Sequence, residues 1–165
     1  MRKKTFFIFF LVHLTTVVWS QNYTKTPTGL KALIASKAIE IQLFAPGVIR
    51  VSKSPDENYQ KKKSLSVIAE PTNTKFSIEA HKGFVFINTS SLKIKLDIFN
   101  GKIEYFDKEG QSLMAEQANG SSFLPLKDLN KKSYQLRQGF DIAPGQAIYG
   151  LGQHQQGILN YRNNS

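Results

Sequence analysis

Apolar and polar residues alternate in short runs through most of this chain, and turn residues separate the runs. Alternation over about four to eight residues is typical of a strand with one buried face. No stretch keeps an apolar period of 3.6 residues over the length of a helix. The alternation predicts strands at residues 39–43, 48–52, 65–69, 76–78, 84–87, 92–98 and 103–106.

Turn residues between these runs predict antiparallel hairpins. Asn100–Gly101 is the strongest such signal, because both residue types tolerate a positive φ. Farther along, residues 117–122 predict a polar connection and residues 123–126 a short irregular segment, followed by a strand over 134–142 with a bulge at Gly139. Many short strands separated by turns predict an all-β fold, an antiparallel β-sandwich, and not alternating β-α units.

The N-terminus has the pattern of a secretory signal peptide over residues 1–20. A basic start precedes a run of fourteen mostly apolar residues, 5–18, and a cleavage site is expected before Gln21. A membrane anchor is the alternative, although a spanning helix needs about 20 apolar residues. We therefore expect an exported protein, periplasmic or secreted, with a polar leader at 21–30 and one domain at 31–165.

The positive charge of the chain does not indicate a nucleic-acid partner. The formal net charge is +10, and removal of the three basic residues of the signal peptide leaves 19 basic against 12 acidic residues, or +7. Most of the remaining lysines alternate with apolar residues, as in 92–96, which predicts the outer face of strands. The only run, Lys61–Lys63, is predicted to be a solvated loop; a nucleic-acid patch is the alternative.

The chain lacks the motifs of several large classes of active site. It has no cysteine, which excludes thiol catalysis, thiolate metal sites and disulfides. His81 and His154 are far apart in sequence and lack metal-ligand spacing, so neither a metal nor a cofactor is expected. There is no G-x-S-x-G motif, and Gly150-Leu151-Gly152 lacks the third glycine of a dinucleotide-binding loop.

Carboxylates also give no catalytic pair. Two closely placed carboxylates are typical of glycoside hydrolysis. Asp97, Glu104, Asp107 and Asp141 all lie in strand or turn contexts with no apolar pocket around them. We predict that they occupy solvated faces or cap turns, and we assign no catalytic residue to this chain.

The most informative stretch is the last one, residues 146–162. An apolar run at 147–149 predicts a short strand that ends in glycine. A loop of amides, one histidine and further glycines follows, with an aromatic and basic end. Glycines that allow close backbone approach, beside amides and an imidazole, are typical of a loop that faces a ligand.

These residues resemble glycoside hydrolase family 31. The similarity lies in Y-G-L-G at 149–152 and in G-Q-H-Q-x-G-x-L-N-Y-R at 152–162, a form most similar to the bacterial α-xylosidase branch. The strand patterns at 39–51 and 92–110 are similar to the galactose-mutarotase-like N-terminal β-sandwich of that family. The resemblance covers about residues 31–162.

The resemblance implies a retaining glycosidase that acts on α-linked glucosides or xylosides, with an α-xylosidase favoured. In the family the sandwich precedes a (β/α)8 barrel, which supplies an aspartate nucleophile in a W-x-D-M-N-E type motif and an aspartate acid/base. Neither motif occurs in this sequence. The chain is therefore expected to be an inactive fragment that supports the barrel, an intramolecular partner, and edges the pocket for an α-linked oligosaccharide.

By the same resemblance, His154, Tyr161 and Arg162 are candidates for substrate binding at the edge of the pocket. The alternative is that His154 and Gln155 bond to the loop backbone and that Arg162 pairs at the interface between sandwich and barrel. A function of another class also stays open, a stand-alone secreted β-sandwich module that binds carbohydrate or another protein.

Overall fold

The computed structural model describes residues 22–55, 65–128, 131–150, 157 and 160–162. The expected signal peptide lies outside these residues. Ten strands and no helix are found among them, so the described chain also contains no helix able to cross a membrane.

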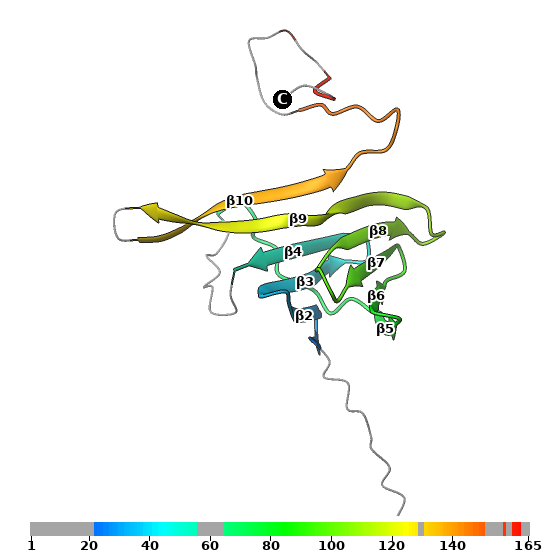
Figure 1. Cartoon of the computed structure of the whole chain (residues 1–165). Helices are drawn as coiled ribbons and strands as arrows, with labels where there is room; N and C mark the ends of the chain where they lie inside the picture. The colour runs from blue at the N-terminus through cyan, green and yellow to red at the C-terminus, as the bar shows by residue number, and fades with distance from the viewer. Residues whose placement is uncertain (1–21, 56–64, 129–130, 151–156, 158–159, 163–165) are drawn as a thin grey trace, which may run out of the picture.

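Two antiparallel sheets face each other (Figure 1). The first has the order β1-β2-β3-β4 and the second the order β10-β9-β8-β7-β6-β5. The strands are β1 Tyr23–Thr26, β2 Gly29–Ile34, β3 Lys37–Ala45, β4 Val48–Ser54, β5 Ser77–His81, β6 Phe84–Asn88, β7 Leu92–Asp97, β8 Ile103–Asp107, β9 Ser112–Asp128 and β10 Lys131–Asp141.

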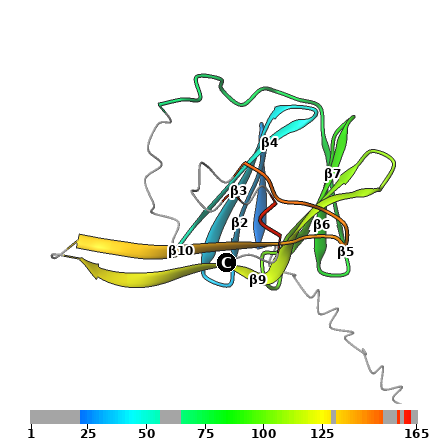
Figure 2. The same ribbon diagram turned by 90° about the horizontal axis from the view of Figure 1, so that it is seen from above.

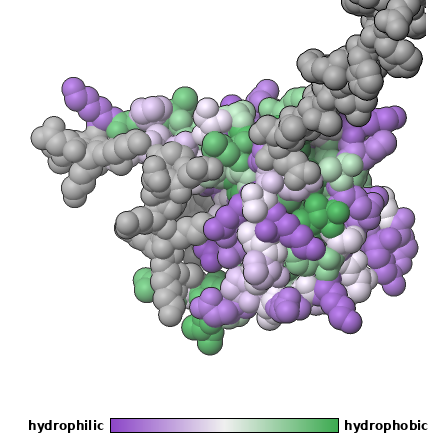
Figure 3. All heavy atoms as spheres, turned by 90° about the horizontal axis from the view of Figure 1, so that it is seen from below, coloured by the Kyte–Doolittle hydropathy of each residue, from purple (hydrophilic) through white to green (hydrophobic). Residues whose placement is uncertain are grey.

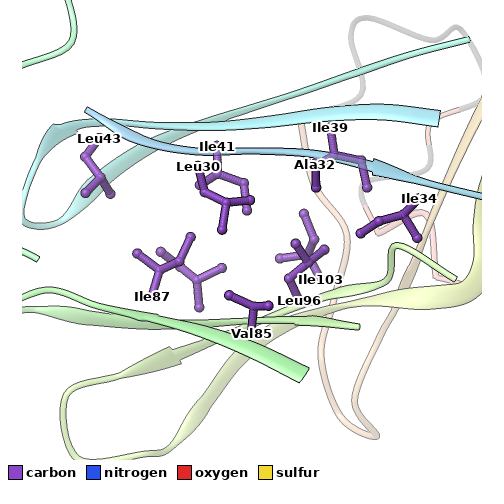
Figure 4. Packing of buried hydrophobic residues seen from close by; sticks show 11 residues of the cluster. Leu30, Ala32, Ile34, Ile39, Ile41, Leu43, Val85, Ile87, Leu96 and Ile103 are labelled. Atoms are coloured by element: carbon purple, nitrogen blue, oxygen red, sulfur yellow. The ribbon is translucent and has the colours of Figure 1, made fainter. Parts of the chain in front are cut away.

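The inward-facing residues of both sheets form one apolar core (Figure 4). Alternate residues supply it, because successive side chains of a strand point to opposite faces. In the second sheet, for example, Ile87 pairs with Ile94 and Val85 with Leu96. The core residues are Leu30, Ala32, Ile34, Ile39, Ile41, Leu43, Val85, Ile87, Ile94, Leu96 and Ile103. The predicted antiparallel all-β fold is confirmed.

Two turn predictions agree with the structure. Asn100 and Gly101 lie between β7 and β8, and Gly101 has a φ of 76°. The carboxylate of Asp97 accepts hydrogen bonds from Phe99 N at 2.8 Å and Asn100 Nδ2 at 2.8 Å, which fixes this turn. The register of β9 and β10 shifts between Gln138 and Phe140, so the bulge expected at Gly139 is present.

The stretch 21–30 differs from the polar leader that we expected. It contributes β1 and the first residues of β2 to the four-stranded sheet. Its residues are polar because β1 is an edge strand that is held by backbone pairing to β2 and covers little of the core. Leu30, by contrast, is fully buried.

Two further predictions of secondary structure are wrong. Residues 65–69 form no strand; Leu65 and Ile68 are exposed, and the segment crosses from one sheet toward the other. Residues 117–126 are neither a connection nor irregular but part of β9, which runs for 17 residues. Backbone pairing with β10 maintains the strand there, although its side chains do not alternate between polar and apolar.

The β9–β10 hairpin projects beyond the rest of the sandwich (Figure 2). β8 pairs with β9 only near residues 112–115, whereas β10 pairs with β9 from residue 115 to residue 128. Most of the hairpin is therefore a two-stranded ribbon that leaves the edge of the six-stranded sheet.

Candidate functional site

The chain after β10 begins with a tight turn. Ala143 N donates to Gln146 Oε1 at 3.0 Å, and Gln146 N donates to Ala143 O at 3.2 Å. Gly145 between them has a φ of 83°, a value that glycine adopts without strain. Residues 147–149 form no strand, so that prediction is wrong: no strand lies beside them to pair with in the part of the chain described.

Asn160 joins the two ends of the following loop. Its Oδ1 accepts hydrogen bonds from Ile148 N at 3.1 Å and from Arg162 N at 3.0 Å. Tyr161 N also donates to Ile148 O at 2.9 Å. Residues 148 and 160–162 therefore lie side by side.

Arg162 completes this closure. Its Nη1 donates to Ala143 O at 2.8 Å and to Gln146 O at 2.5 Å. Hydrogen bonds from a charged donor are stronger than those between neutral groups. We call Ala143, Gln146, Ile148, Asn160 and Arg162, with their mutual hydrogen bonds, the loop clasp.

The structure brings two of the three sequence-predicted site residues together. Tyr161 and Arg162 are half-buried neighbours; Arg162 belongs to the loop clasp, and Tyr161 N donates to Ile148 O beside it. His154 lies outside the described residues, as does Gln155. Arg162 holds neighbouring backbone in place, because its Nη1 donates to the carbonyl oxygens of Ala143 and Gln146.

The other sequence candidates occupy ordinary positions in the sheets. His81 ends β5 and is exposed, as expected for a turn residue. Asp97 and Asp107 each cap a turn, the latter by accepting a hydrogen bond from Gln111 N at 2.7 Å. Asp141 is exposed and Glu104 pairs with lysines. Within the described residues, no group of three or more His, Cys, Asp or Glu side chains could hold a metal ion.

Glu104 lies between two lysines on the outer face of the six-stranded sheet. Its carboxylate is 2.7 Å from Lys95 Nζ and 3.4 Å from Lys102 Nζ. The hydrogen bond from Lys95, with the charges of both lysines, lowers the pKa of Glu104 below its usual 4.5, although partial burial opposes this.

This lowered pKa leads to a pH-dependent prediction. A carboxylate with a lowered folded pKa stabilises the protein above the unfolded pKa, and the contribution disappears as the pH falls through the folded value. Glu104→Gln should therefore cost about 0.5–1 kcal/mol at pH 7 and progressively less below pH 4.5. Urea unfolding at pH 7 and at several values below 4.5 measures this; a constant difference between wild type and variant would contradict it.

Sequence reasoning missed a buried ion pair between the two sheets. Lys53 of β4 and Glu116 of β9 are 2.6 Å apart, and their side chains are only 9% and 5% exposed. The sequence did contain a signal for Lys53, because Lys53 continues the alternating series Ile49, Val51 and so faces inward. Glu116 had no comparable signal, since its strand does not alternate.

Further polar groups satisfy this pair. Lys53 Nζ also donates to Gly101 O at 3.0 Å and to Ser121 Oγ at 3.0 Å, and Glu116 Oε2 accepts from Ile103 N at 2.9 Å. Ser121 Oγ lies 2.5 Å from Gln138 Oε1 of β10. We call Lys53, Glu116, Ser121 and Gln138 the inter-sheet cluster.

Burial dominates the electrostatics of this cluster. It lowers the pKa of Lys53 from its usual 10.5, although the hydrogen bond and charge of Glu116 oppose the change. Burial, together with the Glu116 charge, raises the pKa of the nearby Tyr105 well above its usual 10. The cluster joins β4 of the first sheet to β9 and β10 of the second.

Comparisons with known proteins give a consistent result. The family model described as "Glycosyl hydrolase 31 N-terminal galactose mutarotase-like domain" matches residues 38–164. The crystal structure of the GH31 α-xylosidase from Xanthomonas citri is similar over 83% of this chain, with 28% identity and a TM-score of 0.76. A GH31 α-xylosidase from a soil metagenome, solved with xylose, is similar in fold over 84% of the chain, with 19% identity and a TM-score of 0.67.

The matched region is a small part of each of these proteins. This chain spans 15% of the length of the Xanthomonas citri enzyme and 23% of the length of the metagenomic one.

Proposed function

Because this chain belongs to glycosyl hydrolase 31 through the N-terminal galactose mutarotase-like domain of that family, we propose that it is the supporting domain of an exported α-xylosidase. The sandwich holds a catalytic barrel and edges its sugar pocket. The observation that carries the proposal is the similarity to the Xanthomonas citri α-xylosidase, at 28% identity over 83% of the chain.

The reaction class follows from the family. Glycosidases that retain the anomeric configuration use a carboxylate nucleophile and a carboxylic acid/base about 5–5.5 Å apart. Neither group is assigned to residues 1–165, and we propose that a barrel in a longer polypeptide supplies both. Taken alone, these residues are proposed to be inactive toward glycosides.

The loop clasp gives the tail its part in this function. The hydrogen bond between Ile148 and Asn160 holds the two ends of the loop together, and these joined ends form its base. His154 and Tyr161 are proposed to contact sugar or to support the pocket from that base, and Arg162 to hold the base in shape. The signal-peptide pattern at residues 1–20 supports export to the periplasm or the medium.

Substitution of Arg162 tests the role of the loop clasp. In the longer polypeptide, Arg162→Met removes two charge-assisted hydrogen bonds and should lower kcat/KM for an α-xyloside by about 10-fold, because small displacements of binding groups are costly. Proteolysis within residues 149–159 should become faster at the same time. An unchanged rate of hydrolysis with an unchanged rate of cleavage would contradict the assignment.

The experiment that tests the function compares substrates on the polypeptide that contains residues 1–165 and its C-terminal continuation. We expect kcat/KM to be higher for p-nitrophenyl α-xyloside than for the α-glucoside, with retention of the anomeric configuration by NMR. A preference for the glucoside would contradict the assignment of the substrate as an α-xyloside but would not affect the assignment to the family. Binding of glycans without any hydrolysis would instead favour a carbohydrate-binding module.

A further inference from the structure

The β9–β10 ribbon contains a projecting arm, residues 122–127 of β9 and 133–137 of β10. Register pairs run from Ser122↔Arg137 to Leu126↔Ser133. Within the described part of the chain, neither strand of the arm has a second neighbour in its sheet. Figure 2 shows it extending past β2 and β3.

Both faces of the arm carry exposed apolar side chains. Leu124 and Leu126 share one face and are 57% and 55% exposed. Leu136, on the other face, is 68% exposed and lies opposite Phe123, whose ring meets that of Tyr134 edge to face at 6.5 Å. Apolar and polar side chains are mixed along the projecting arm in the space-filling view (Figure 3).

An arm of this kind, exposed to water on both faces, has little packing of its own to stabilise it. A two-stranded ribbon without further packing is marginally stable, and contiguous exposed apolar surface marks an interaction site. Exposed large apolar residues also lie elsewhere, among them Leu33 of β2, Val48 of β4 and Phe99 after β7, so exposure alone does not set the arm apart. What distinguishes the arm is that its exposed leucines lie on a ribbon with no further strand beside it among the described residues, which favours a partner that packs against it.

The inter-sheet cluster fixes the direction of the arm. Ser121 and Gln138 are the residue pair immediately before the arm, and Ser121 is bonded to Lys53 of the opposite sheet. The base of the arm is thus attached to both layers of the sandwich. A preformed arm of fixed direction loses little conformational freedom when a partner packs on it.

We propose that the arm is the docking surface for the catalytic domain of the same polypeptide. This rests on the proposed function. The matched chain covers only 15% of the Xanthomonas citri α-xylosidase, so most of such a protein lies outside the sandwich. The described tail, 142–150 and 160–162, lies on the side of β10 away from β2–β4 (Figure 1), which is the side on which a domain joined to it is proposed to pack.

The test uses the longer polypeptide with Leu124→Glu and Leu126→Glu combined. We expect amide hydrogen exchange at 122–127 and 133–137 to be at least about 10-fold faster than in the wild type, because charged side chains prevent packing on that face. Thermal unfolding should change from one transition to two. The matched control, Leu33→Glu with Val48→Glu, should leave exchange in the arm unchanged.

Cross-linking gives a readout that needs no substitution. Exposed Lys127 of the arm should form cross-links to lysines beyond residue 165, whereas exposed Lys108 should not. Wild-type arm amides that exchange as fast as those of the double variant would overturn the proposal. Cross-links from Lys127 to a second, isotopically labelled copy would overturn it in favour of self-association. Hydrolysis of α-xylosides is assayed separately, so failure of the docking surface and failure of the function are distinguishable.

Discussion

Replacing Lys53 with methionine is expected to lower the free energy of unfolding by about 3–5 kcal/mol, the usual cost of removing one partner of a buried ion pair. Glu116 would keep its charge at 5% exposure, with the amide of Ile103 still donating to it but without the ammonium. The carbonyl of Gly101 and the hydroxyl of Ser121 would also lose the ammonium donor. Urea denaturation of residues 21–165 at pH 7 measures the loss.

A double variant separates the interaction energy of Lys53 with Glu116 from the contributions of their other neighbours. Lys53→Met with Glu116→Gln removes both charges while the amide side chain can still accept from Ile103 N. It should be more stable than Lys53→Met alone, with a coupling energy of about 1–3 kcal/mol. Lys108→Met is the matched control, because Lys108 and Glu109 are a fully solvated pair and the change should cost less than about 0.5 kcal/mol. Equal losses in Lys53→Met and Lys108→Met would contradict the account.

The lowered pKa of Lys53 adds a pH signature. The unfolded chain binds the proton of this lysine more tightly than the folded chain, so the free energy of unfolding rises with pH between the lowered pKa and 10.5. In Lys53→Met, the free energy of unfolding should rise less steeply with pH over this range. Denaturation midpoints at several alkaline pH values below 10.5 compare the two proteins.

Gly29→Ala is the second substitution with a large expected effect, a loss of about 3 kcal/mol or more of stability. Gly29 has a φ of 153°, and a Cβ built on it would lie 2.0 Å from the carbonyl oxygen of Ile41 on the paired strand β3. That oxygen belongs to the backbone of a central strand, so β2 and β3 must separate to admit the methyl group. The experiment is chemical denaturation of residues 21–165.

Gly47→Ala provides the control for this substitution. A Cβ at Gly47 would have no neighbour nearer than 3.9 Å, the Cβ of Ser91, and the change should be nearly neutral. The comparison also tests the position of residues 21–30, which the sequence had predicted as a leader. A tolerated Gly29→Ala would mean that this stretch does not pair with β3 in solution.

The strands of the core were predictable because their sequences alternate cleanly. At Ile39, Ile41 and Leu43 each inward residue is large and each intervening residue is polar or only partly buried. In β2 the same inward series includes the small Ala32, while the outward Leu33 is apolar, which obscures the period. The burial of Leu30 depends on the opposite sheet and cannot be inferred from its own neighbours.

The ribbon was not predictable for a different reason. Alternation identifies strands that have one dry face and one wet face, whereas Leu124 and Leu136 lie on opposite faces and are both exposed. The loop clasp was likewise hidden, because the hydrogen bonds of Arg162 to Ala143 and Gln146 span 16 to 19 residues. What the sequence did provide was the family resemblance in residues 149–162 and the absence of a catalytic carboxylate pair.

The account claims that these residues are a supporting sandwich whose chemistry is supplied by the rest of a longer glycosidase. The most direct measurement is a hydrolysis assay with p-nitrophenyl α-xyloside on residues 21–165 alone and on the longer polypeptide, at equal concentration. We predict hydrolysis by the longer polypeptide and none above background by residues 21–165. Hydrolysis above background by residues 21–165 alone would contradict the account.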